Sequence, residues 1–123
     1  MEDNTLTSIL YSIKKLLGIA PSYDAFDNDI ILHINSVLMV LNQLGVGPEE
    51  GYAITGATES WTDYLGSAFA NVELVKSYIY LKVKLMFDPP QSAGAVQAIK
   101  EQISEFEWRI NVQVDPKEVT QNG

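Results

Sequence analysis

Cysteine is absent from the 123 residues of this chain. A disulfide framework, a nucleophilic thiol and a cysteine-based zinc site are therefore excluded. Basic residues are also few, since eight Lys and Arg stand against 16 Asp and Glu and leave a net charge of −8. Because Lys and Arg supply most of the non-specific affinity of nucleic-acid-binding proteins, this balance argues against tight DNA binding.

Long apolar runs are lacking as well. Polar side chains such as His33, Asn42 and Lys82 interrupt the apolar stretches, and none approaches the roughly 20 residues that a membrane-spanning helix requires. A chain of this length forms one domain, and with 46% hydrophobic residues it can bury a core without a disulfide or metal. We therefore expect a single domain with no membrane-spanning helix.

Helical periodicity runs through four segments of the chain. Apolar residues recur at three- and four-residue spacing over residues 6–17, about 24–44, 71–87 and 92–110. Gly18, Gly45 and the Asp88-Pro89-Pro90 sequence are typical helix ends. The second segment is apolar around most of its circumference, which indicates a central helix buried on several sides. The pattern predicts an all-α fold, a small four-helix bundle.

Two segments depart from the helical pattern. Residues 45–70 are rich in glycine and indicate a long loop between helices 2 and 3. Within this loop, residues 52–55 are compatible with a short strand, and Ser60 with the cap of a helical turn. After Asn111, valines alternate with polar residues in a strand-like manner. We therefore predict a helical domain over 1–110 and an extended C-terminal tail over 111–123, which a partner would order.

Candidate catalytic and metal-binding groups are scarce. Asp29 and His33 lie four residues apart on a predicted helix, but a zinc site needs three or four ligands. Asp24, Asp27 and Asp29 lack the glycine and terminal glutamate of a calcium-binding EF-hand loop, and they suit the acidic first turn of a helix. No glycine-rich phosphate loop or nucleophile elbow occurs. We expect a protein that is not an enzyme and that uses no metal or cofactor.

The two tryptophans have different expected environments. Trp61 is expected to lie in the core. Trp108 follows Phe106 by two residues, and two such side chains cannot share one face of a helix. A tryptophan beside an arginine, here Arg109, is typical of protein interfaces. Trp108 is equally compatible with an interface and with packing against residues 45–70.

Four stretches stand out together: SIKKLLGI (12–19), HINSVLMVLNQLGVGP (33–48), YIYLKVKLMFDPP (78–90) and EFEWRINVQVD (105–115). In this order and spacing they resemble the small head–tail connector, or adaptor, proteins of long-tailed phages and prophages, over about residues 6–115. The resemblance implies a virion structural protein at the head–tail interface that is assembled in the host cytoplasm. It also implies a homo-oligomeric, dodecameric ring below the portal protein, which extends the DNA channel without binding DNA specifically and docks a stopper or tail protein.

The resemblance further implies a portal contact, because the C-terminal segment of such proteins commonly engages the portal. By position, the corresponding partner-binding residues are Trp108, Arg109, Asn111, Val112, Gln113, Val114 and Asp115. In the predicted extended conformation, Val112 and Val114 would be able to add a strand to the edge of a partner's sheet. The long loop over 45–70 is a candidate for a second contact surface.

A second class of function stays open at this point. A small acidic regulatory module without a virion role would also be helical and non-enzymatic, and it would bind a host protein as a monomer or dimer. Assembly on a portal distinguishes the two hypotheses.

Overall fold

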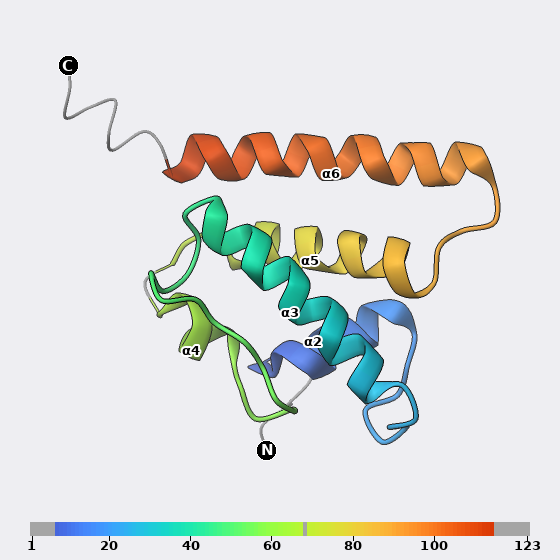
Figure 1. Ribbon diagram of the computed structural model, residues 1–123, viewed down its shortest axis with the longest axis horizontal. Helices are drawn as coiled ribbons and strands as arrows, with labels where there is room; N and C mark the ends of the chain where they lie inside the picture. Colours follow the sequence, from blue (N-terminus) through green and yellow to red (C-terminus); the bar gives the residue numbers. More distant parts are fainter. Residues whose placement is uncertain (1–6, 68, 115–123) are drawn as a thin grey trace.

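The computed structural model describes residues 7–67 and 69–114 of the chain. Five helices lie within these residues (Figure 1). They are α2 (Ile9–Leu17), α3 (Asp27–Gln43), α4 (Trp61–Leu65), α5 (Val72–Phe87) and α6 (Ala93–Val114). No strand occurs within these residues, and a single antiparallel bridge joins Ser8 to Ser60. The predicted all-α helical bundle is thus confirmed. None of the described helices combines the length and apolar character needed to cross a membrane.

Local signals set the two ends of α2. The Ser8 hydroxyl accepts a hydrogen bond from the Tyr11 backbone N–H and caps the first turn. Gly18 ends the helix at φ 83°, as the sequence predicted. Between these caps, Ile9, Leu10 and Ile13 are buried in the core.

Lys14 is fully buried although it lies in the last turn of α2. Its Nζ lies 2.7 Å from Asp27 Oδ1, in an ion pair that lacks the alignment of a good hydrogen bond. The same ammonium group donates to the backbone carbonyls of Pro21, at 3.1 Å, and Tyr23, at 2.8 Å. One cation therefore holds the connection between α2 and α3 and the first turn of α3.

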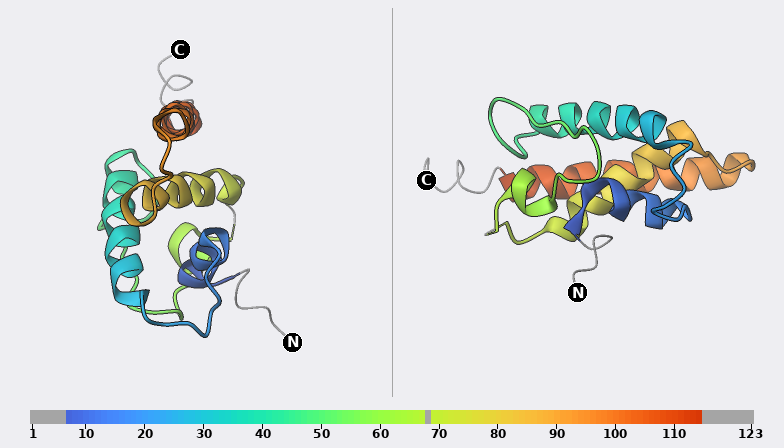
Figure 2. Two further views of the ribbon diagram at one scale, coloured as in Figure 1. Left: turned by 90° about the vertical axis from the view of Figure 1, so that its right-hand side faces the viewer. Right: turned by 90° about the horizontal axis from the view of Figure 1, so that it is seen from below.

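The central helix of the bundle is α5. It packs against α2, α3 and α6, and Figure 2 shows it between α6 on one side and α2 on the other. By contrast, α3 buries one face only, since Leu32 and Met39 are 67% and 65% exposed. The prediction of α3 as the central helix is therefore wrong. Apolar residues around a helix raise its average hydrophobicity but do not specify which neighbours cover them.

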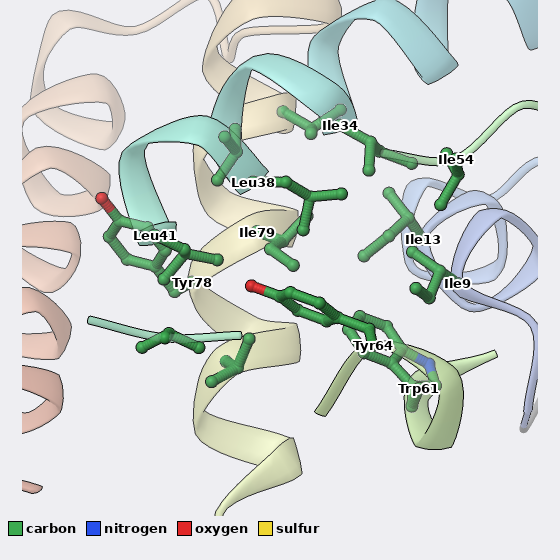
Figure 3. Close-up of a cluster of buried hydrophobic side chains, with 14 of the residues drawn as sticks. Ile9, Ile13, Ile34, Leu38, Leu41, Ile54, Trp61, Tyr64, Tyr78 and Ile79 are labelled. Carbon is green, nitrogen blue, oxygen red and sulfur yellow. The ribbon is translucent and has the colours of Figure 1, made fainter. Parts of the chain in front are cut away.

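The long segment between α3 and α5, in which only α4 is helical, contributes side chains to the core. Val46, Ile54, Trp61 and Tyr64 are buried together with side chains of α2, α3 and α5 (Figure 3). Ser60 caps α4 in a reciprocal capping box with Asp63. This confirms the predicted helical turn and the predicted burial of Trp61.

Asn35 takes the place of a strand partner for residues 52–55. Its Oδ1 accepts a hydrogen bond from the Ile54 backbone N–H at 2.8 Å, and its Nδ2 donates to the Ile54 carbonyl at 2.9 Å. One side-chain amide on α3 thus satisfies both backbone groups of a buried residue. The short strand considered for 52–55 is not formed, because this amide meets the backbone requirement that a neighbouring strand would otherwise meet.

Gly47 and Gly51 provide a matched test of how tightly this segment packs. Both have a left-handed backbone, with φ of 89° and 96°. A Cβ at Gly47 would lie 2.6 Å from Cε1 of buried Tyr64, whereas at Gly51 it would meet nothing within 4 Å. We expect Gly51→Ala to cost about 1 kcal/mol of unfolding free energy through backbone strain. Gly47→Ala should cost about 2 kcal/mol more, because Tyr64 must move within a packed core. Equal losses for the two variants in urea denaturation would contradict this packing.

The C-terminal segment differs from its prediction. Residues 111–114 continue α6 to Val114, so they are neither a strand nor an extended tail, and the helix predicted over 92–110 does not end near Ile110. The physical reason is that no helix breaker occurs between Ile110 and Pro116, and extending an existing helix by a turn is far easier than starting one. The rest of the predicted tail, 115–123, lies outside the described residues.

Candidate partner-binding surface

α6 forms an outer layer on α5, on the side away from α2 (Figures 1 and 2). Its inward face buries Ile103 and Ile110, and Ile99 and Phe106 are partly buried against the core. Its outer face is mainly polar and includes an ion pair in which Arg109 Nη2 lies 2.7 Å from Glu105 Oε2. Both partners are more than half exposed, so this pair adds little to stability.

A buried tyrosine joins α6 to the core. Tyr78 of α5 is fully buried, and its hydroxyl donates a 2.7 Å hydrogen bond to Glu107 Oε2 of α6. In Figure 3 this hydroxyl points away from the core cluster toward α6. Burial raises the pKa of the Tyr78 phenol, and the hydrogen bond to the Glu107 carboxylate and its negative charge raise that pKa further. The phenol therefore stays protonated and remains a hydrogen-bond donor.

A groove lies between the first turn of α5 and the C-terminal half of α6, and its volume is about 720 Å³. It is lined by Asn71, Leu74, Gln102, Glu105, Phe106, Trp108, Arg109 and Val112. Half of the lining side chains are apolar, and the other half are polar or charged. Such a mixture is typical of surfaces that bind a partner through a central apolar contact.

Trp108 is the largest exposed side chain at this groove. It is 65% exposed, so it is not buried against residues 45–70. Val112, one helical turn further on, is 45% exposed and extends the same apolar strip. Exposed tryptophan beside a recess is a common anchor of protein–protein contacts.

The structure brings together only part of the predicted set. Trp108, Arg109 and Val112 line the groove, whereas Asn111 is exposed outside its lining. The backbone of residues 113 and 114 is helical, and Asp115 lies outside the described residues. Sequence reasoning missed the wall that α5 contributes. Leu74 was recognisable as an apolar residue beside the main apolar face of its helix. Because it is far from Trp108 in the chain, the sequence did not show that the two residues line one groove.

The other candidate groups do not converge on a site. His33 lies against Phe87, with 6.4 Å between ring centroids, as a packed residue of α3. Within residues 7–67 and 69–114, no three Asp, Glu or His side chains are placed to hold a metal ion. Asp27, from the acidic cluster before and within α3, is instead the partner of Lys14.

Comparison with known proteins identifies the family. A family model for phage connector proteins matches residues 9–117, a span that includes every described helix and the whole groove. No curated protein and no solved structure matches the chain significantly. The chain therefore belongs to the phage connector protein family, and its role is that of a head–tail connector.

Proposed function

We propose that this connector assembles as a dodecameric ring on the portal protein and that the groove between α5 and α6 is the portal contact. The observation that carries the proposal is the exposure of Trp108 and Val112 beside that groove. Burying a tryptophan removes a large apolar area from water, and such residues dominate the free energy of many interfaces. The ring extends the DNA channel and docks a stopper or tail protein on its other side.

The charge of the chain supports a passive role toward DNA. The net charge of −8 opposes tight binding of the phosphate backbone, so DNA would pass through an acidic ring without being held. The same holds for α3, which contains Asp27 and Asp29 but no Lys or Arg that would bind a DNA phosphate. We further propose that the subunit is not an enzyme, requires no cofactor, and enters the virion by assembly in the host cytoplasm.

A ring also requires two unlike surfaces on each subunit. Trp108 belongs to a surface at the C-terminal end of α6, and the other faces of the subunit are left for the second contact. Membership of the connector family favours this role over the alternative of a small acidic regulatory module.

The test is assembly on the portal protein encoded in the same genome, imaged by negative-stain electron microscopy. The full-length chain is expected to add a ring of density to one end of the portal. A chain ending at Ile110 lacks Val112 and the last turn of α6, and it should add much less density at the same concentration. Circular dichroism of the shortened chain serves as the control for folding. Absence of added density with the full-length chain would contradict the proposed function.

A further inference from the structure

The apolar face of α6 repeats along the helix. Its apolar residues alternate in steps of three and four, through Val96, Ile99, Ile103, Phe106 and Ile110. A shift of seven residues along α5 therefore presents nearly the same face, with Ile103 in the place of Val96 and Ile110 in the place of Ile103. Apolar contacts alone discriminate weakly between such registers.

The connection between α5 and α6 does not remove this ambiguity. Seven residues of helix correspond to about 10 Å. The five residues 88–92 between the two helices reach roughly 17 Å when extended. The hydrogen bonds from Gln97 to Glu101 and from Arg109 to Glu105 lie within α6, so they would survive a shift unchanged.

The contact between Tyr78 and Glu107 does discriminate between registers. The phenol is fully buried and donates to the carboxylate at 2.7 Å. A shift of seven residues would place Lys100 or Val114 at the position of Glu107. Neither side chain contains a hydrogen-bond acceptor, so the buried hydroxyl would lose its partner. The native register alone provides a carboxylate at this point.

We propose that Tyr78 and Glu107 are positioning residues that fix the register of α6 on α5. A buried polar pair that specifies register is the best-attested role of such pairs in helical assemblies. In this register Leu74 of α5 forms one groove with Trp108 and Val112 of α6, and a shift of about 10 Å would separate them. The consequence for portal binding rests on the proposed function, whereas the register itself does not.

The test is a distance measurement between α3 and α6. The chain has no cysteine, so Met39→Cys and Ser104→Cys, both at exposed positions, carry nitroxide labels without further changes. Double electron–electron resonance should give one distance in this background. Tyr78→Phe and Glu107→Ala should each add a second population, displaced by up to about 10 Å. The ratio of shifted to native register should rise about tenfold or more, as expected for loss of a hydrogen bond to a charged group.

Two variants serve as matched controls. Glu107→Gln retains an oxygen that accepts from the phenol, so it should keep the single distance. Tyr64→Phe removes the hydroxyl of another buried tyrosine, for which no hydrogen-bond partner is found among the described residues, and it should also keep the single distance. A single unchanged distance in both Tyr78→Phe and Glu107→Ala would overturn the proposal. A second population in Tyr64→Phe would overturn it too, because general loosening of the core would then explain the shift.

Portal binding by the same variants separates the two proposals. Tyr78→Phe and Glu107→Ala should weaken binding in proportion to their shifted populations, and Glu107→Gln should bind like the unmodified chain. Unchanged portal binding by a variant that has shifted would overturn the claim that the register assembles the contact surface. If the unmodified chain fails to bind the portal while the distances shift as expected, the proposed function fails and the register assignment stands.

Discussion

Replacing Lys14 with methionine is expected to lower the free energy of unfolding by about 3 kcal/mol. The ammonium group is fully buried and serves Asp27 and the carbonyls of Pro21 and Tyr23. Methionine fills similar space but leaves the Asp27 carboxylate without its ion-pair partner and the two carbonyls without their hydrogen-bond donor. Removing one partner of a buried ion pair typically costs about 3–5 kcal/mol, and the lower end applies because the Asp27 side chain is 25% exposed.

Lys15 provides the matched control for this substitution. It is the next residue on α2 and is exposed, so Lys15→Met should change the unfolding free energy by less than about 0.5 kcal/mol. Urea denaturation followed by circular dichroism measures both variants. Adding Asp27→Asn to Lys14→Met should recover part of the loss, since the unpaired charge is then gone. A loss below about 1 kcal/mol for Lys14→Met would show that this cation does not hold the connection between α2 and α3.

Helix ends set by local chemistry could be predicted from the sequence. Gly18 ends α2, and Asp88 with the two prolines ends α5, because these residues act on the backbone next to them. The burial of Lys14 could not be predicted in the same way. A lysine in the last turn of a helix suits the helix dipole equally well when it is exposed, and its partners are assembled only by the fold.

The remaining features depend on contacts between residues far apart in the chain, and these contacts could not be predicted from the sequence. The Asn35 side chain makes the two hydrogen bonds to the Ile54 backbone that a neighbouring strand would otherwise make. No local sequence pattern predicts these hydrogen bonds. At the candidate surface, Trp108 was recognisable because it cannot lie on the same helical face as Phe106. The groove, however, also requires Leu74 of α5. The position of Leu74 relative to Trp108 depends on how α6 lies on α5, which a repeating apolar stripe does not specify.

Trp108→Ala is expected to weaken binding to the portal protein at least 30-fold, equivalent to about 2 kcal/mol. An exposed tryptophan at the centre of a contact contributes mainly by burying its rings when the partner docks. Because the side chain is 65% exposed in the subunit, its removal should change the unfolding free energy by less than about 0.5 kcal/mol. A titration of the portal with fluorescently labelled subunit measures the affinity, and urea denaturation measures the stability.

Met39→Ala is the control for exposure, because Met39 is also 65% exposed but lies on α3. It should leave portal affinity within a factor of about two, since it removes apolar surface away from the groove. Equal affinity losses in Trp108→Ala and Met39→Ala would show that the portal does not single out the groove of α5 and α6. A loss confined to Trp108→Ala, at unchanged stability, would assign the portal contact to this end of α6, because only the groove residues would then distinguish two equally exposed apolar side chains.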